Sequence, residues 1–286
     1  MLLIMAVWGL NLPVLKSLTS HFDAALLAAL RMAAGAVVLA FLLARRPAFA
    51  VQVRLSHWLR LFGAASLMVY LYQLCMTEGI ARTTATNGAL VSALHPIVAS
   101  FVALAMRGER VRPLRLLGAV VALSGVSIVV LQQPFAQLQH ASTGDFLIFA
   151  GLGIYCLGAV IVQRVLAELD ALVVSMMTQA FGAALLLTHA AFAAAWNDAP
   201  PRIGNTAWLW IAVLLSGAIS TGFSGLMWNR AIAVIGMARA SMWLYWVPVF
   251  GMAAAALFLE EPLTGWHVLG LGLVLAGTHL ATRRSL

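Results

Sequence analysis

Residues 80–96 read IARTTATNGALVSALHP, and residues 232–248, which lie 152 positions further on, read IAVIGMARASMWLYWVP. Both stretches begin with isoleucine, contain no acidic residue and end in proline. The same shift aligns further pairs, namely Glu109 with Glu261, Gly118 with Gly270, and Gly125 with Gly277. We therefore predict an internal repeat in which residues 72–127 correspond to residues 224–279.

The repeat extends toward the N-terminus. A shift of 147 positions carries residues 7–44 onto 154–191, and it aligns Trp8 with Tyr155, Asp23 with Asp170, Ala24 with Ala171, and Gly35 with Gly182. The difference between the two shifts, 147 and 152, is what a loop insertion in the second copy would produce. Each copy contains five apolar runs, and an odd number of spans forces the two copies into opposite orientations. Inverted repeats with a site between them are an architecture of transporters.

The composition places the chain in a lipid bilayer. Its 286 residues are 63% hydrophobic and 9% charged, with a mean hydropathy of +0.98, whereas soluble domains are about 25% charged. The net charge of +8 does not indicate nucleic-acid binding, because the arginines cluster between apolar runs. We expect lipid and a small-molecule substrate as partners, and no nucleic acid.

Ten apolar runs have about the length that a bilayer requires. They are residues 2–18, 24–44, 57–78, 84–106, 113–131, 144–165, 172–196, 206–228, 237–259 and 264–282. We predict an all-α membrane protein with ten transmembrane helices in two inverted five-helix repeats, 1–132 and 144–286, joined by a loop at 133–143. Two fused repeats can supply both halves of a pathway, so we expect a monomer.

The basic residues predict an orientation. If the N-terminus is inside, 13 of the 17 basic residues lie in inner loops or adjoining helix ends. They are Arg45, Arg46, Arg54, Arg60, Arg107, Arg110, Arg112, Arg115, Arg164, Arg230, Arg239, Arg283 and Arg284. The outer side holds Lys16, Arg82 and Arg202, and Arg31 lies within a span. Cytoplasmic loops are enriched in Lys and Arg, so we expect both termini in the cytoplasm.

Arg31 and Glu78 are opposite charges at similar predicted depths. Charges within a membrane are costly and require a partner or a role, so we expect a structural ion pair that closes or orients the outer half. In the alternative interpretation Arg31 anchors a substrate carboxylate, or Glu78 carries a proton. A third possibility is that both side chains reach the interface.

Candidate cavity residues begin in the first span. Trp8 and Asn11 lie one turn apart, and Pro13 just beyond them can free a backbone carbonyl. A broken helix at mid-membrane can present such groups to a ligand. Tyr155, the repeat partner of Trp8, joins this group. The competing interpretation is an interfacial tryptophan and a helix-to-helix hydrogen bond from the asparagine.

Two proline-centred spans contribute further candidates. Trp243 and Trp246 are three residues apart and share a face ahead of Pro248, while His95 precedes Pro96 at the matching depth. The prolines weaken both helices and favour a hinge or an irregular binding segment. Aromatic faces bind organic substrates and cations, although aromatic packing between helices is the competing interpretation.

The third span adds Tyr70, which shares a predicted helix face with Gln73 and Thr77. Tyr72 and Gln179 are further polar side chains within spans. By contrast, the glycine-rich runs 113–131 and 264–282 have glycines seven residues apart, which lets two backbones approach closely. We expect these two helices to pack together and not to line the cavity.

These features together resemble the drug/metabolite transporter superfamily, EamA type. The resemblance rests on WGLNLPVLK at 8–16, AALLAALRMAAGAVVL at 24–39, the proline-centred helices, and the acidic turns RGERVRP at 107–113 and LEEPLTG at 259–265. It implies ten helices in two inverted repeats and export of metabolites across the bacterial inner membrane. The aromatic candidates look most like the amino-acid-exporting, YddG-like branch.

Two other functions compete with transport. The run GFSG at 222–225 has the form found in rhomboid intramembrane proteases, with His279 two spans later, but an activity confined to one copy leaves the duplication unexplained. A passive channel would show rings of repeated polar residues, whereas the matched positions here differ. No spacing typical of metal ligands or phosphate loops occurs, so we expect no metal and no cofactor.

We therefore predict a secondary transporter, not an enzyme, that exports small organic metabolites by alternating access. Amino acids, including aromatic ones, are the expected substrates, with cationic drugs or other metabolites as the alternative. The predicted substrate-binding residues are Trp8, Asn11, Tyr70, His95, Tyr155, Trp243 and Trp246. The predicted structural or gating residues are Arg31, Glu78, Pro96 and Pro248.

Overall fold

The computed structural model describes residues 1–45, 54–107, 113–131, 135–196, 201–235, 240, 243–244 and 246–282, and all regular structure in these ranges is helical. The α-helices are α1 (Leu2–Thr19), α2 (Ala24–Ala44), α3 (Leu55–Ala65), α4 (Tyr72–Arg82), α5 (Ala85–Ser92), α6 (His95–Arg107), α7 (Pro113–Leu131), α8 (Phe135–Val165), α9 (Ala171–Trp196), α10 (Ala207–Leu215), α11 (Ser224–Ile235), α13 (Trp246–Phe258) and α14 (Gly265–Thr282). Two π-helical segments, η1 (Ser66–Leu71) and η2 (Ser216–Phe223), connect α3 to α4 and α10 to α11.

Six helical stretches among the described residues are long and apolar enough to cross a bilayer. They are Leu2–Thr19, Ala24–Ala44, Leu55–Arg82, Thr143–Val165, Ala171–Trp196 and Ala207–Ile235. Leu116–Val129, Trp246–Phe258 and Gly265–Leu280 are shorter apolar helices. The chain is thus an all-helical protein with several membrane-spanning helices, and the arrangement of ten spans in two inverted repeats stays a prediction.

The helix surfaces suit lipid as a solvent. Val37, Val120 and Leu257 are 68%, 64% and 77% exposed, and apolar side chains at this exposure would be unfavourable in water over so large an area. A helix pairs its own backbone N–H and C=O groups, which lipid cannot do. This is why runs rich in Ala, Leu and Val form helices here without an amphipathic face.

The segment 133–143, predicted as a connecting loop, is helical from Phe135 onward and continues without a break into α8. No Gly or Pro lies between Phe135 and Gly144, and the Ala, Gln and Leu residues of this stretch favour helix. The apolar run that was expected to begin at 144 is therefore preceded by a helical connection.

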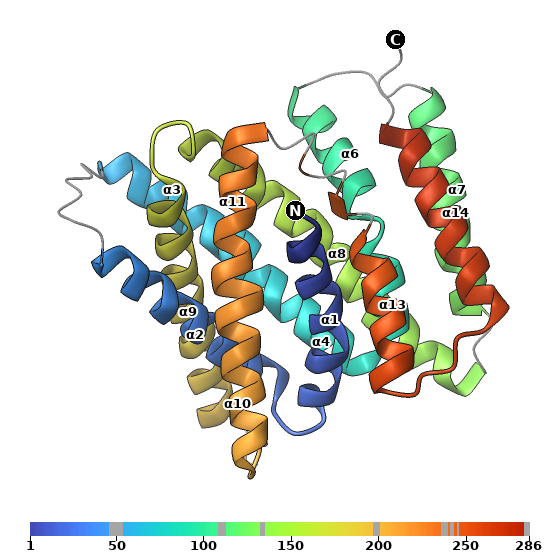
Figure 1. Ribbon diagram of the computed structural model, residues 1–286, viewed down its shortest axis with the longest axis horizontal. Coiled ribbons are helices and arrows are strands. Elements are labelled where there is room, and N and C mark those ends of the chain that lie inside the picture. The colour runs from blue at the N-terminus through green and yellow to red at the C-terminus, as the bar shows by residue number, and fades with distance from the viewer. Residues whose placement is uncertain are drawn as a thin grey trace.

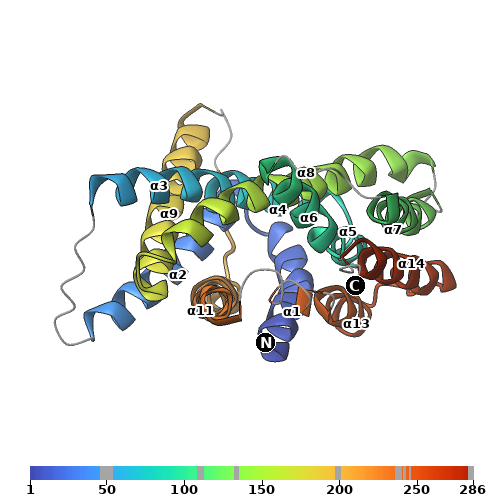
Figure 2. The same cartoon turned by 90° about the horizontal axis from the view of Figure 1, so that it is seen from above.

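The two halves of the chain interleave (Figure 1). Helix α1 packs against α13 and α11 of the second half, and α8 packs against α4 and α3 of the first half. Figure 2 shows α2, α3 and α9 toward one end of the molecule and α7 and α14 at the other. Helices from both halves consequently meet at the centre.

Helices α7 and α14 pack backbone to backbone. A methyl group on Gly125 would lie 2.6 Å from the carbonyl oxygen of Gly270, and one on Gly277 would lie 2.4 Å from the backbone nitrogen of Ala122. Only glycine permits this approach, as in other membrane helix pairs. The prediction that the glycine-rich helices pack together is confirmed.

Candidate substrate cavity

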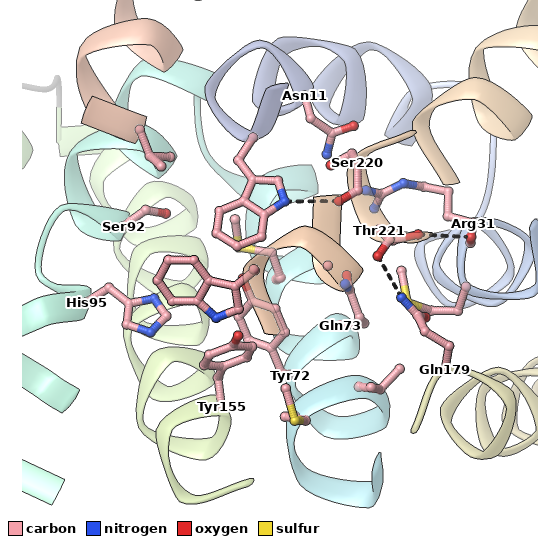
Figure 3. Close-up of a pocket in the computed structure, with 18 of the residues that line it drawn as sticks. Asn11, Arg31, Tyr72, Gln73, Ser92, His95, Tyr155, Gln179, Ser220 and Thr221 are labelled. Carbon is pink, nitrogen blue, oxygen red and sulfur yellow. Dashed lines mark hydrogen bonds between the residues drawn. The ribbon is translucent and has the colours of Figure 1, made fainter. Parts of the chain in front are cut away.

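A cavity of about 190 Å³ lies at the centre, with walls from α1, α2, η1, α4, α5, α6, α8, α9, η2, α11 and α13 (Figure 3). The lining residues come largely in repeat-matched pairs. A shift of 152 relates six pairs, namely Met68 to Ser220, Val69 to Thr221, Gln73 to Gly225, Met76 to Trp228, Ser92 to Leu244 and His95 to Val247. A shift of 147 relates three more, namely Trp8 to Tyr155, Arg31 to Thr178 and Met32 to Gln179. The same positions of both copies thus surround one space, although the side chains differ.

A chain of polar groups fixes one side of the cavity. Arg31 is 2% exposed, and its Nε donates a hydrogen bond to Ser216 Oγ at 2.8 Å. The Ser216 hydroxyl in turn donates to Asn11 Oδ1. Three helical segments, α2, η2 and α1, are therefore joined by buried hydrogen bonds, which are expensive to leave unmade.

The π-helical turn in η2 exposes backbone carbonyls to side chains. A π-helix bonds i to i+5, as the Ser224 N–H does to the Ile219 oxygen. The indole Nε1 of Trp8 donates to the backbone carbonyl oxygen of Ser220 at 2.9 Å. Nε2 of Gln179 donates to the backbone carbonyl oxygen of Thr221 at 2.8 Å. Figure 3 shows both bonds at the cavity wall. Such π-turns often occur at functional sites.

Aromatic rings form the opposite wall. The ring centroids of Trp8 and Trp228 are 5.3 Å apart, and those of Tyr72 and Tyr155 are 5.0 Å apart. His95 meets Tyr155 edge-on at 5.0 Å. These separations are typical of favourable aromatic pairs. The wall presents a large, rigid apolar surface that ends in a few polar atoms.

Three buried polar atoms in the cavity lining have no hydrogen-bond partner within the part of the chain that the structure describes. They are His95 Nε2, Gln179 Oε1 and Trp228 Nε1. The backbone carbonyl oxygen of Thr221 that Gln179 contacts can only accept, so the amide nitrogen must face it and Oε1 is left over. Buried polar groups are normally paired, so these atoms are suited to a ligand or to water.

Several contacts hold together the end of the molecule at which α1 finishes, called here the Lys16 end. Lys16 Nζ donates to the Ile80 and Ala81 oxygens, at 3.1 and 3.2 Å, at the end of α4. The carboxylate of Glu261, from the turn before α14, accepts from two backbone N–H groups at the start of α5, each at 2.9 Å, and from the Thr86 hydroxyl at 2.6 Å. A carboxylate is favourable at a helix N-terminus. Segments from both halves are thus tied together across this end.

The opposite end carries a different polar cluster. Glu168, in the turn between α8 and α9, accepts a bond from His57 Nε2 at 2.7 Å and one from Arg60 at 3.0 Å. The hydrogen bond from His57 is the main cause that lowers the pKa of Glu168, and Arg60 acts in the same direction. This cluster joins α3 to the α8–α9 turn.

A comparison with known families shows to which family this helical chain belongs. Residues 1–131 and 142–283 match the model of the EamA-like transporter family. The chain belongs to this family. Its membership, together with the names of its relatives, indicates a transporter and not an enzyme.

Relatives agree with this assignment. The uncharacterized transporter YyaM of Bacillus subtilis (strain 168) is 25% identical over 207 residues, which cover 71% of this chain and 66%, just under two thirds, of the relative. A protein of Streptantibioticus cattleyicolor named "Probable terminal-alkyne amino-acid exporter" is 25% identical over 291 residues, covering 100% of this chain and 93% of that protein. One solved crystal structure is 21% identical, with a TM-score of 0.66 over 97% of this chain and 94% of that one, which shows a shared fold.

Four of the predicted substrate-binding residues of this EamA-like transporter lie in the cavity wall. They are Trp8, Asn11, His95 and Tyr155. The structure places the other three, Tyr70, Trp243 and Trp246, outside it. Whether the four cavity residues contact a substrate stays a prediction.

The displacement of Tyr70 has a helical cause. The expected face of Tyr70, Gln73 and Thr77 assumed 3.6 residues per turn, but Tyr70 lies within the wider π-turns of η1. The register changes there, so Gln73 faces the cavity while the hydroxyl of Tyr70 lies 3.0 Å from His189 Nδ1 on the outer surface.

Trp243 and Trp246 are 38% and 47% exposed. The backbone at Trp243 and Leu244 forms a 3₁₀ turn ahead of α13, and this turn directs Leu244 and Val247 into the cavity instead. Both indoles are thus partly exposed and lie outside the cavity lining.

The predicted ion pair between Arg31 and Glu78 is not formed. Glu78 pairs with Arg82 one turn along α4, at 2.8 Å, and Arg31 bonds to Ser216. Glu78 is near the end of α4, where its carboxylate reaches the surface, while Arg31 is enclosed. Similar depth along the membrane normal was therefore not enough to bring the two together.

The predicted irregular segments at the two prolines are present. Helix α5 ends at Ser92 and α6 begins at His95, one residue before Pro96, and α13 begins at Trp246, two residues before Pro248. Proline is tolerated in the first turn of a helix because its missing N–H has no intrahelical partner there. The first span is thus interrupted at residues 93–94, and in the described part of the second span a 3₁₀ turn at Trp243 and Leu244 precedes α13.

Two prominent cavity residues, Tyr72 and Trp228, were not among the predicted site residues, and neither was Ser216, which bonds to Arg31 of the cavity wall. The repeat carried a usable signal for one of them, because Trp228 matches Met76 and both line the cavity. Ser216 and Tyr72 depend on π-turns, which no sequence pattern indicated. The rhomboid-like pair is separated, since α11 carries Ser224 and α14 carries His279, and these helices lie apart in both views (Figures 1 and 2).

Proposed function

We propose that this chain is a secondary transporter that exports amino acids, including aromatic ones, from the bacterial cytoplasm by alternating access. The observation that carries the proposal is the central cavity, whose lining includes nine matched pairs of positions in the two halves. A site shared by two repeats can be exposed to either side when one repeat moves against the other.

The inverted-repeat arrangement is supported by packing. Spans predicted to be repeat partners contact one another, namely α2 with α9, α7 with α14, and, between the spans 84–106 and 237–259, α5 with α13. The π-segments η1 and η2 also overlap under the shift of 152. The distribution of arginines supports cytoplasmic termini in the inner membrane, which places the Lys16 end outside. A monomer suffices because one chain encloses the whole cavity.

Amino acids are favoured over drugs by size and charge. The cavity of about 190 Å³ is smaller than the roughly 300–1,000 Å³ of sites for drug-sized ligands. Its wall contains a buried arginine and, in the described ranges, no Asp or Glu, which disfavours cationic drugs. A relative named as an amino-acid exporter points the same way.

Counterflow in liposomes that contain the purified protein tests the proposal. Vesicles loaded with one unlabelled amino acid should accumulate the same labelled amino acid transiently, with saturation, for a subset of a panel. Repeating this with an imposed pH gradient tests proton coupling. Monodisperse protein that gives no counterflow with any amino acid would overturn the proposed substrate class.

A matched pair of glycine variants links transport to the cavity. Gly225 lines the cavity and has open space toward it, with Gln179 Nε2 at 4.0 Å as the nearest atom to an added Cβ, while Gly272 has nothing within 4 Å. Gly225→Phe should abolish counterflow by filling the cavity. Gly272→Phe, on α14, should retain it. Equal activity in both variants would exclude this cavity as the pathway.

A further inference from the structure

The cavity wall contains one buried charged side chain within the described residues, Arg31 of α2. Its Nε is used by Ser216, which fixes the plane of the guanidinium. In Figure 3 the side chain reaches toward Asn11 and Ser220 at the edge of the open space. The position matched to Arg31 in the second repeat is Thr178, so the charge occurs on one side of the cavity only.

The two terminal nitrogens of Arg31 bond to no acceptor in the described part of the chain, and they are not among its fully enclosed polar atoms. They therefore face the cavity. No carboxylate of the described residues lines the cavity to neutralise them. Asp23 bonds to Arg202, Glu78 to Arg82, Asp145 to Thr83, Glu168 to His57 and Arg60, Asp170 to the backbone of Leu172, and Glu261 to the start of α5, while Glu260 lies in the turn between α13 and α14.

A guanidinium stays charged under all conditions in a protein. A buried charge without an opposite charge is strongly unfavourable, and within membranes such a residue usually marks a substrate or ion pathway. The terminal nitrogens of arginine form a planar pair that matches the two oxygens of a carboxylate. A cavity that exposes this edge of a fixed guanidinium is thus suited to one anionic group at a defined place.

The remaining wall fits the rest of such a solute. The aromatic rings of Trp8, Trp228, Tyr72 and Tyr155 offer an apolar surface. No acidic side chain of the described lining is available for an ammonium group, and the unpartnered Gln179 Oε1 is an uncharged acceptor. The described lining therefore offers a formal charge to the anionic end of a solute and none to a cationic end.

We infer that Arg31 binds the carboxylate of the transported solute. The cargo class is organic acids with one free carboxylate and an apolar remainder, and amino acids belong to it through their carboxylate and not through their ammonium group. This inference rests on the proposed function, because it assigns chemistry to the same cavity. Acids that lack a free amine should therefore be accepted as well.

Binding to the purified protein tests the inference without requiring transport. The probes are L-phenylalanine, N-acetyl-L-phenylalanine, 3-phenylpropionate and L-phenylalaninamide, with leucine and leucinamide as an aliphatic pair. Thermal stabilisation should occur with each acid, and the amides should bind at least about tenfold more weakly, the loss expected for charged hydrogen bonds. Amides that bind as well as the acids, or no stabilisation by any acid, would overturn the inference.

Variants locate the effect at Arg31. Arg31→Gln should reduce the preference for acid over amide to near unity, and Arg31→Lys should retain a weaker preference. Arg82→Gln is the matched control, because Arg82 pairs with Glu78 at the exposed end of α4 and should leave the preference unchanged. If Arg31→Gln does not fold, the acid-over-amide preference of the wild type and its reduction in Arg31→Lys test the inference instead. A wild-type preference that persists in Arg31→Gln would assign the carboxylate to another residue.

Binding and transport separate the two proposals. Acid-selective binding without counterflow would support the role of Arg31 and refute transport of these solutes. Counterflow that is indifferent to the carboxylate would support transport and refute the role of Arg31.

Discussion

Arg31 Nε lies 2.8 Å from Ser216 Oγ, and this hydrogen bond joins α2 to the π-helical segment η2 inside the cavity wall. The serine is 185 positions away along the chain. Because Ser216 also donates to Asn11, it determines where the guanidinium lies and which of its nitrogens remain open. Its role is therefore to position Arg31.

Replacing this serine should weaken both stability and acid recognition. Ser216→Ala leaves the buried Nε of Arg31 without an acceptor, which costs roughly 1–3 kcal/mol, and it lets the guanidinium rotate. We expect a lower Tm in detergent and a reduced preference for phenylalanine over its amide. Ser124→Ala is the control, because Ser124 bonds only to its own helix and is exposed. A lower Tm with an unchanged acid preference would make Ser216 a stabilising residue only.

The carboxylate of Glu261 should hold the Lys16 end closed. Glu261→Gln removes the charge that caps α5, an effect of about 0.5–2 kcal/mol, or about two- to thirtyfold in a population. In a background without Cys75 and Cys156, a cysteine at Leu15, which is 1% exposed and lines the cavity, should then react faster with an impermeant maleimide applied to this end.

The neighbouring Glu260 provides the control for this experiment, since it makes none of the contacts that tie α5. Glu260→Gln should leave the labelling rate of Leu15→Cys unchanged. If Glu261→Gln also leaves that rate unchanged, the Glu261 contacts do not control access to the cavity.

The close approach of α7 and α14 predicts a large difference between two glycines on one helix. Gly277→Ala places a methyl group 2.4 Å from the Ala122 nitrogen, whereas Gly272 has open space. Overpacking costs about 1–3 kcal/mol, so Gly277→Ala should lower the Tm. Gly272→Ala should keep or raise it, because alanine favours helix by roughly 1 kcal/mol over glycine. Equal Tm values would show that the helix pair adapts without strain.

The Glu168 cluster predicts a pH-dependent contribution to stability. The hydrogen bond from His57 lowers the pKa of Glu168 from its ordinary value of 4.5, so the folded state favours the ionised form. This stabilisation is present above the unfolded-state pKa and is lost as the pH falls through the lower folded-state pKa. The Tm of wild type should exceed that of Glu168→Gln at neutral pH, and the difference should shrink below about pH 4.5. If the difference in Tm between wild type and Glu168→Gln did not change with pH, it would come from packing and not from the charge of Glu168.

The sequence predicted more of the fold than of the cavity, for physical reasons. Helix positions, the glycine contacts and the interruptions at Pro96 and Pro248 follow from hydropathy and local backbone chemistry, which a short window of sequence contains. Tyr70 shows where this fails, because one π-turn changes the helix face that a regular period assigns.

The sequence also did not identify the hydrogen-bond partner of Arg31. Opposite charge and equal depth favoured Glu78, but Ser216 occupies the place beside the guanidinium, and this contact depends on how α2 packs on η2. The repeat predicted cavity residues better than charge pairing did, because positions matched by a constant shift line the cavity in pairs. Residues such as Trp228 could be found by applying the shift to Met76 once one half is placed.

The placement of the tryptophans predicts that two similar substitutions differ in effect. Trp8→Phe keeps an aromatic ring in the wall but removes the donor to the Ser220 oxygen, which leaves a buried carbonyl unpaired at a cost of about 1–3 kcal/mol. Counterflow by this variant should fall several-fold or more. Trp246→Phe should stay within about twofold of wild type, because Trp246 is 47% exposed outside the cavity lining and its loss leaves no unpaired group at the cavity. The measurement is the initial counterflow rate normalised to reconstituted protein. A deficit in Trp246→Phe as large as that in Trp8→Phe would mean that the outer face of α13 takes part in transport, and the cavity would have to extend to it in another conformation.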